Sequence, residues 1–229
     1  MKAMTARRSF LARLAAAAAA LGLGSSAADA QAPTAPPTPA PAAAAPPPDT
    51  RWQPAREAKD DWYDQIPGKH RLVFDAVSPE GASSAIGFAN NFFTGNKNGY
   101  GLEPADVAVV IVLRHRATQF AFTDAIWAKY GAALSESEKF TDPKTSVAPI
   151  VNIYRSGLEA HVQRGVHFAV CDLSTHRLAN FIARKSEANA DAIYKELTSN
   201  ALPNVHFVAA GILAVNRAQE RGYAVAHTG

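Results

Sequence analysis

Runs of apolar residues alternate with helix-like patterns along the chain from residue 68 onward. The stretch Asp106–Leu113 has no polar residue after its aspartate and is rich in valine. Such a run is typical of a central strand that is buried on both faces of a parallel sheet. Other runs predict four more strands, at Lys69–Val77, Gly165–Cys171, Val205–Ala209 and Tyr223–Ala226.

Between these strands the apolar residues recur at helical spacing. We expect a helix over Ser83–Gly95 before a Gly- and Asn-rich turn, and a second helix capped by Thr118 that carries Phe122, Ile126, Trp127 and Tyr130. A polar loop is expected over Leu134–Pro149, and further helices at Ser156–Gln163, Thr175–Lys185, Ala190–Leu197 and Ile212–Arg221. Strands alternating with helices predict a three-layer α/β/α sandwich around a mainly parallel five-stranded sheet, whose strand order the pattern does not determine.

Residues 1–30 resemble a twin-arginine export signal. Arg7 and Arg8 precede an apolar stretch over residues 14–23, and Ala28-Asp29-Ala30 provides a small-residue cleavage site. The apolar stretch is shorter than the roughly 20 residues that a membrane-spanning helix needs. We therefore expect cleavage near Ala30, export to the periplasm and no stable membrane anchor.

The rest of the chain divides by composition. Residues 31–50 are almost entirely Ala and Pro and are expected to form an extended linker. Residues 51–67 contain Trp52, Trp62 and Tyr63 and are expected to lie as an ordered arm over the domain or over a neighbouring subunit. Residues 68–229 have the length of one α/β domain.

Charge argues against two classes of partner. Four of the 23 Lys and Arg residues and one of the 20 Asp and Glu residues lie in the first 30 positions, which leaves 19 of each afterwards. A mature chain without net charge lacks the basic surface that nucleic acids and anionic membranes require. We therefore expect neither partner.

Cys171 is the only cysteine of the chain and ends a predicted strand. Ligands of open α/β sheets gather at the carboxyl ends of the strands, so the thiol is well placed for chemistry. Asp172-Leu173-Ser174-Thr175 offers caps for a following helix, whose start together with His176 would favour the reactive thiolate. The alternative is that Cys171 is a small buried core residue.

Other candidates stand near the ends of neighbouring strands. His115 follows the central strand between Arg114 and Arg116, where it would exchange a proton, orient a sulfur anion or cap the sheet edge. Gly211 permits close backbone approach at a helix start and would help hold an anion, or it only forms a tight turn. The remaining histidines lack the spacing of a zinc site, and no cofactor is predicted, although metal or haem binding at His115 and Cys171 stays open.

Three motifs resemble those of the DsrE/DsrF-like proteins. They are the strand Gly165–Cys171, the strand that leads through Val205–Ala209 into Gly211, and the turn Gln219-Glu220-Arg221-Gly222-Tyr223. In order and spacing they cover roughly Lys69 to Gly229, and the chain is most similar to an exported branch of that family. The resemblance implies a small three-layer α/β protein that forms homo-oligomers and carries persulfide sulfur on the cysteine at position 171.

Three functions are therefore considered. The first is a periplasmic sulfur-handling protein in which Cys171 accepts or relays sulfane sulfur, with a small sulfur compound or a protein thiol as its partner. Whether it is an enzyme of the sulfurtransferase kind or a stoichiometric carrier stays open. The second is a non-enzymatic module that binds a ligand, metal or haem, and the third is a structural oligomer subunit on the same fold.

Overall fold

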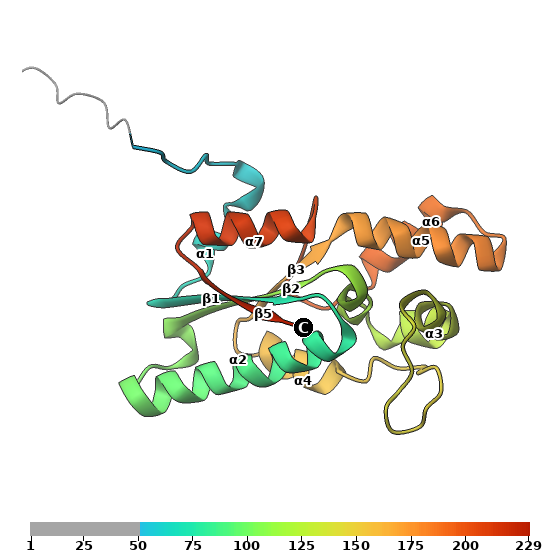
Figure 1. The fold of residues 1–229 in the computed structure, drawn as a ribbon, viewed down its shortest axis with the longest axis horizontal. Helices are drawn as coiled ribbons and strands as arrows, with labels where there is room; N and C mark the ends of the chain where they lie inside the picture. Colours follow the sequence, from blue (N-terminus) through green and yellow to red (C-terminus); the bar gives the residue numbers. More distant parts are fainter. Residues whose placement is uncertain (1–50) are drawn as a thin grey trace, which may run out of the picture. The chain divides into compact units, whose positions relative to one another are not determined.

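Five parallel strands form the centre of the protein, in the order β4-β3-β2-β1-β5 (Figure 1). Every residue of the central strand β2 is buried, because helices cover both faces of the sheet. The strands are β1 (His70–Ala76), β2 (Val107–Leu113), β3 (His167–Cys171), β4 (Val205–Val208) and β5 (Ala224–Thr228). The predicted three-layer α/β/α fold is confirmed, with a sheet that is parallel throughout.

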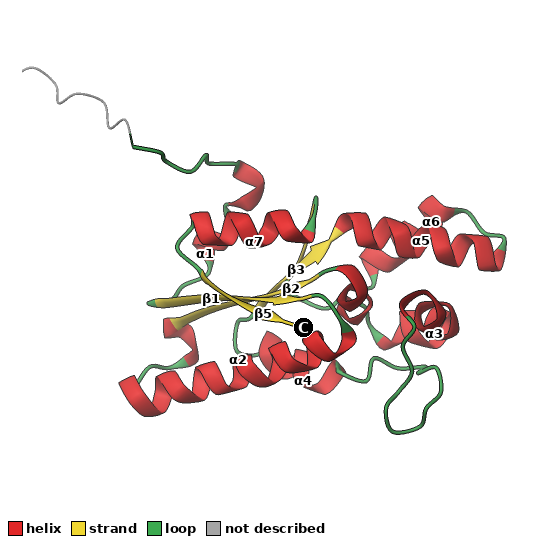
Figure 2. Cartoon of the chain, in the orientation of Figure 1, coloured by secondary structure: helices red, strands yellow, loops and turns green. Residues whose placement is uncertain are grey.

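The coordinates are a computed structural model that describes residues 51–229, and these residues form one compact unit. The predicted signal peptide and the predicted linker lie outside the described residues. Figure 2 shows the helices around the sheet. They are η1 (Ala58–Asp60), α1 (Trp62–Gln65), α2 (Pro79–Tyr100), η2 (Pro104–Asp106), η3 (His115–Ala121), α3 (Asp124–Glu138), α4 (Arg155–Val162), α5 (Asp172–Ser186), α6 (Ala190–Ser199) and α7 (Gly211–Glu220), where η marks a 3-10 helix. None of those in residues 51–229 combines the length and the apolar character needed to cross a membrane.

Strand alternation divides the core between the two faces of the sheet. Phe74, Ile111 and Phe168 point to the face that α2, α3 and α5 cover. Their neighbours Val73 and Val110 point to the other face, where α7 and the segment before β1 pack. Figure 1 shows α7 and α1 on one side of the sheet and α2 and α4 on the other.

Helix α2 is longer than predicted. It begins at Pro79, where the Ser78 side chain accepts a hydrogen bond of 2.9 Å from the Gly81 amide, and it ends at the left-handed Gly101. The Gly- and Asn-rich stretch expected to be a turn is therefore helical. Apolar residues at helical spacing on the buried face, ending with Phe93, outweigh the poor helix propensity of the exposed residues.

The predicted cap at Thr118 is wrong. Thr118 is buried inside the 3-10 helix η3, where its hydroxyl donates to the Leu113 carbonyl, and α3 begins after Thr123 instead. Helix α3 continues to Glu138, so the polar loop starts later than expected. A short 3-10 turn between a strand and a helix has no periodicity of its own that the sequence pattern reveals.

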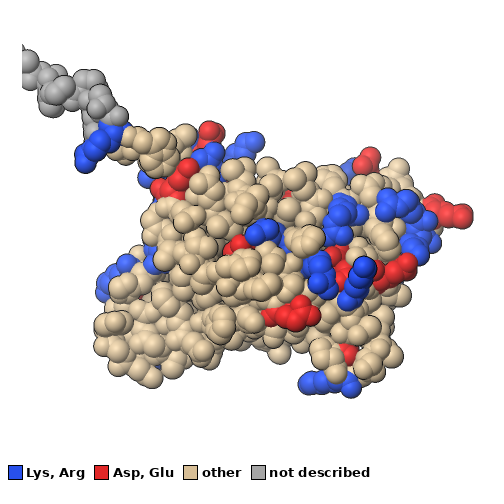
Figure 3. Space-filling model, in the orientation of Figure 1, with Lys and Arg blue, Asp and Glu red and all other residues tan. Residues whose placement is uncertain are grey.

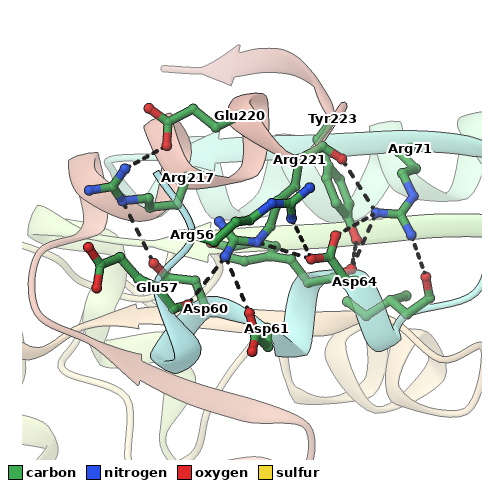
Figure 4. Close-up of polar contacts among 12 residues, drawn as sticks. Arg56, Glu57, Asp60, Asp61, Asp64, Arg71, Arg217, Glu220, Arg221 and Tyr223 are labelled. Carbon is green, nitrogen blue, oxygen red and sulfur yellow. Dashed lines mark hydrogen bonds and ion pairs between the residues drawn. The ribbon is translucent and has the colours of Figure 1, made fainter. Parts of the chain in front are cut away.

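The later part of the segment 51–67, with Tyr63 and Ile66, packs against the face of the sheet that α7 covers (Figure 4). Tyr63 is fully buried and donates a 2.9 Å hydrogen bond to the Ala214 carbonyl, while the Tyr223 hydroxyl donates to the Tyr63 carbonyl at 2.8 Å. The buried Arg221 guanidinium lies 3.4 Å from the Asp64 carboxylate. The arm is thus part of the domain core as well as its surface.

Candidate functional site

The carboxyl end of the sheet brings together five residues, which we call the Cys171 site. They are Asp75 of β1, Arg114 after β2, Cys171 of β3, Gly211 of α7 and His227 of β5. The first three each follow by two positions a strand residue that packs on the α7 face, namely Val73, Val112 and Ala169. Because alternate strand residues share a face, all three side chains point to the α7 side of the sheet.

Cys171 is both the last residue of β3 and the N-cap of α5. It is 6% exposed and forms no disulfide, and its carbonyl accepts a 3.0 Å hydrogen bond from the Thr175 hydroxyl. The amides at the start of a helix and its dipole favour negative charge at that position. The thiol therefore belongs to a residue at both a strand end and a helix start, with little contact with water.

Arg114 is fixed beside Cys171 by a carboxylate. Its Nε and Nη2 donate to the two Asp75 oxygens at 2.6 and 2.9 Å, which makes the ion pair bidentate. Asp75 is only 5% exposed. Burial alone would raise the pKa of Asp75, but hydrogen bonds from Arg114 and from His227 hold it below its ordinary value. The pKa of Arg114 is raised, chiefly by the bond to Asp75, and Cys171 adds a smaller electrostatic contribution. The site therefore holds a permanent cation within electrostatic reach of the thiol.

Gly211 leaves room for the Arg114 side chain. A Cβ at Gly211 would lie 2.3 Å from the Arg114 Cβ and 2.8 Å from its Cδ, distances that no side chain tolerates. Gly211 thus acts by its small size at the first residue of α7. The close neighbour at this position is the Arg114 side chain, and anion binding at Gly211 stays a prediction.

Sequence reasoning missed Asp75 and His227. Their Cα atoms are partners in the β1–β5 ladder, and the His227 Nδ1 lies 3.0 Å from an Asp75 carboxylate oxygen. A signal for Asp75 was available, because it is the one acidic residue in an otherwise apolar run near the end of a predicted strand. No sequence pattern indicates His227, because its contact with Asp75 depends on the pairing of β5 with β1.

His115 and Arg116 belong to a second group of residues, which lies toward α3 and α5. The Arg116 guanidinium donates to the Glu138 carbonyl at 3.0 Å, and Arg177 lies 2.8 Å from the Glu138 carboxylate and 3.4 Å from the His115 carbonyl. Figure 3 shows Lys and Arg side chains mixed with Asp and Glu over this end of the molecule. In the described residues, no hydrogen bond joins the exposed His115 ring to Cys171, so their pairing stays a prediction.

His115 nevertheless has an unusual backbone. Its φ is 53°, in the left-handed region that a residue with a side chain seldom adopts. The strain occurs directly at the carboxyl end of β2, and strained residues cluster at functional sites. His115 therefore remains a candidate, next in the chain to Arg114 of the Cys171 site.

His176 points away from the thiol. Its ring stacks on that of Tyr194 at 3.9 Å, and its Nε2 lies 3.5 Å from the Asp172 carboxylate. Asp172 in turn accepts a 2.6 Å hydrogen bond from the Tyr194 hydroxyl. The Asp172 carboxylate is therefore engaged with α6, and His176 stabilises the pairing of α5 with α6.

Gly165 and Gly222, which belong to two of the motifs shared with the DsrE/DsrF-like proteins, lie directly after helices. Gly165 has φ of 79° and follows α4, and Gly222 has φ of 80° and follows α7. In both places the next residue donates its amide back into the last turn of the helix, from Val166 to His161 and from Tyr223 to Ala218. These motif positions set where β3 and β5 begin.

A pocket of about 220 Å³ lies near the thiol but does not include it. The arm, the end of β4 and the first turns of α7 form its walls, with Asp60, Val208 and Arg217 among them. Val208 is the ladder partner of Cys171 in β4. Within residues 51–229 there is no cluster of three metal-ligating side chains, so the site offers a thiol and an arginine and no metal cage.

Comparison with known proteins identifies no family for the chain. No family model matches it, and no curated protein matches it. Among solved structures, it is similar to MTH1491, a protein of unknown function from Methanobacterium thermoautotrophicum, with 16% identity over 69% of this chain and 99% of that one and a TM-score of 0.40. A likeness at this level carries no information about activity.

Proposed function

We propose that the protein is an exported sulfur-handling protein similar to the DsrE/DsrF-like family, in which Cys171 accepts sulfane sulfur as a persulfide and passes it on. The supporting observation is the placement of its only thiol at a strand end and helix start, within electrostatic reach of Arg114. A buried core cysteine would not need a guanidinium that a buried carboxylate holds in place. The Asp75–Arg114 pair is therefore the best evidence for chemistry at this position.

The uptake step is a displacement at sulfur. The Cys171 thiolate attacks the outer sulfur of a donor such as thiosulfate, and a new S–S bond forms as the donor's S–S bond breaks. The bonding electron pair leaves with sulfite, and Cys171 holds the sulfur as an anionic persulfide. In the second step an acceptor thiolate attacks that outer sulfur, and Cys171 leaves as a thiolate, so no external oxidant or reductant is consumed.

Arg114 serves both steps by electrostatics. Asp75 accepts from its Nε and Nη2 and orients the guanidinium, whose remaining N–H groups can still donate to an anionic sulfur. The reactant thiolate and the product persulfide are both anionic, and so is the donor. A fixed cation and the start of α5 stabilise these charges in a site that largely excludes water.

His115, Arg116 and His176 were expected to help bind the sulfur anion. In this function Arg114 binds the sulfur anion. His115 is the candidate for proton exchange, because it is exposed to solvent and is the next residue in the chain after Arg114. Export of the folded protein through the twin-arginine signal, with cleavage near Ala30, belongs to the same proposal. The sulfur donor would then be a periplasmic compound or protein thiol.

Intact-mass measurement tests this proposal directly. The full chain is incubated with thiosulfate or polysulfide, desalted and weighed, and we expect a gain of one sulfur atom that dithiothreitol removes. The variant Cys171→Ala should gain none, and Arg114→Gln should gain sulfur at a rate lower by at least about tenfold, since the loss of a paired charge is worth more than 1.4 kcal/mol. His115→Gln reports on the proposed proton exchange, as a change in the pH profile of uptake. An unmodified wild-type thiol after both donors would refute sulfur handling.

A further inference from the structure

The pocket between the arm and α7 lies next to Cys171. It is lined by Val208, which is the ladder partner of Cys171, so the two Cα atoms are one strand spacing of about 4.8 Å apart. The Cys171 side chain points to the same face of the sheet as Ala169, and Val208 packs on the core of that face. The thiol and the pocket are therefore neighbours on one face of the sheet.

Helix α7 gives this pocket a direction. The helix begins at Gly211, against Arg114 at the carboxyl edge of the sheet. Arg217 follows six residues later, about 9 Å along the helix axis. Because Val208 and Arg217 both line the pocket, it extends from the neighbourhood of the thiol to a guanidinium.

The lining combines an apolar part with charges of both signs. The apolar residues are Phe207, Val208, Ala209, Leu213 and Ala214, and the charged residues are Glu57, Lys59 and Asp60 of the arm and Arg217 of α7. Two carboxylates and two cations balance, so the lining has no formal net charge. A simple anion such as thiosulfate meets two carboxylates there, and a simple cation meets two cationic groups. The lining therefore favours a small molecule that carries both charges at once.

The charged groups of the lining keep capacity for such a ligand. Figure 4 shows Arg217 between Glu220 and Asp60. The Arg217 Nη1 donates to Glu220 at 2.6 Å and its Nε lies 3.7 Å from an Asp60 oxygen, and a guanidinium has further N–H donors. In residues 51–229, no hydrogen bond or ion pair engages the side chains of Glu57 and Lys59. A ligand does not have to displace a partner from either of them.

The size of the pocket limits the ligand. Its volume of about 220 Å³ corresponds to about seven water molecules in the liquid. Pockets for drug-sized molecules are larger, roughly 300–1,000 Å³. A free amino acid fits this volume and carries one ammonium and one carboxylate. A residue within another protein's chain has neutral amides in place of both charges, so it matches the lining less well.

We infer that this pocket binds the sulfur acceptor, a small free thiol of the amino-acid type such as cysteine or homocysteine. The inference rests on the proposed function and names the acceptor of its second step. The ammonium group pairs with Glu57 and Asp60. The carboxylate pairs with Lys59 and Arg217, and the methylene carbon lies on the apolar lining, with the sulfur toward Cys171.

The transfer step then balances without a further reactant. The thiolate of the bound amino acid attacks the outer sulfur of the Cys171 persulfide, and a new S–S bond forms as the bond to Cys171 breaks. The bonding electron pair stays on Cys171, which leaves as a thiolate, and the amino acid departs as an anionic persulfide. Charge also separates the two substrates, because the anionic donor is attracted to Arg114 and the zwitterionic acceptor to the pocket.

Calorimetry tests binding without sulfur transfer. The full chain with Cys171→Ala cannot hold a persulfide, and S-methyl-L-cysteine keeps both charges but has no thiol to react. We expect saturable one-to-one binding, and binding at least about tenfold weaker for 3-(methylthio)propionate and for 2-(methylthio)ethylamine, each of which lacks one charge. A chain that shows no saturable binding of S-methyl-L-cysteine up to about 10 mM overturns the inference, and so does equal affinity for all three compounds.

Substitutions in the same background locate the ligand. Arg217→Gln should weaken binding of S-methyl-L-cysteine by at least about tenfold, because this guanidinium is partly buried. Lys59→Gln should weaken it by about two- to fivefold, and it removes an exposed side chain that the fold does not use. Arg184→Gln changes an exposed arginine in the last turn of α5 and should leave the affinity unchanged. Affinity that survives both pocket substitutions places the ligand elsewhere and overturns the inference.

Transfer is measured on wild type that has first been loaded with sulfur from thiosulfate. Loss of sulfur from Cys171, followed by intact mass, should saturate with the concentration of L-cysteine but not with that of cysteamine, which lacks the carboxylate. The same concentration dependence for both thiols overturns the acceptor role and leaves the proposed function intact. A chain that never gains sulfur refutes the proposed function together with the acceptor role, whereas binding of S-methyl-L-cysteine still supports an amino-acid pocket.

Discussion

The change Asp75→Asn tests the electrostatic design of the Cys171 site. Asparagine keeps the size of the side chain but removes the charge that accepts two hydrogen bonds from Arg114 and one from His227. It also places an amide donor against a donor of the guanidinium. The Arg114 side chain, 23% exposed, is then left partly buried without a counter-charge.

The cost follows from the burial of the pair. Removing one partner of a buried ion pair costs roughly 3–5 kcal/mol, and the access of Arg114 to water reduces this to about 2–3 kcal/mol. For a domain of this length, that corresponds to a fall in Tm of about 4–12 °C. We also expect slower alkylation of Cys171, because the cation beside it is no longer held in place.

The pH dependence of stability tests whether the Asp75 carboxylate stabilises the folded state in its charged form. The folded state lowers the pKa of Asp75 below the ordinary value of 3.8, so its contribution to stability is complete above that value and is lost as the pH falls through the lowered pKa. The difference between wild type and Asp75→Asn should therefore be largest near neutral pH and should shrink below about pH 4.

Thermal denaturation and iodoacetamide labelling of the single thiol measure both effects. Glu136→Gln breaks an exposed ion pair with Lys185 and should change neither, because exposed pairs contribute little. If Asp75→Asn keeps the wild-type Tm at pH 7 and the wild-type alkylation rate, then the pair does not organise this site and the reasoning is refuted.

Two further predictions concern packing and pH. Gly211→Ala should lower the free energy of unfolding by about 1–3 kcal/mol and slow sulfur uptake, because its methyl group would overlap Arg114, and an unchanged urea midpoint would contradict the close contact. Burial and the nearby His167 lower the pKa of His206 to about 4, so stability should fall by about 1–2 kcal/mol as the pH drops from 6.5 toward 4. His206→Gln should flatten this dependence in denaturation curves taken across that range, and an equal slope in the variant would show that other groups cause it.

The strands were the most predictable part of the fold. The run Lys69–Val77 contains β1, and the valine-rich run to Leu113 contains β2, since burial on both faces leaves a direct trace in composition. The ends of helices were less predictable. Helix α2 passes through a stretch that local propensity assigns to a turn, because its buried face and its cap at Ser78 decide the outcome.

The candidate site was half predictable for a related reason. Cys171, Arg114 and Gly211 each end or follow a strand, and the carboxyl ends of parallel strands must meet at one edge. The sequence did not show whether each candidate side chain turns toward the thiol or toward the neighbouring helices. His115 directs no hydrogen bond to the thiol and His176 stacks on Tyr194, because helices α3, α5 and α6 draw neighbouring residues to their own contacts.

The amino-acid sequence by itself determined the layered α/β class, the single thiol and its position at a strand end. These are properties of composition and local periodicity, and each depends on residues that are close in the chain. The tertiary structure alone decided that Asp75 holds Arg114 beside Cys171, and that His227 joins them through the pairing of β5 with β1. These contacts join residues far apart in the chain, and strand order, which no local pattern encodes, is what brings them together.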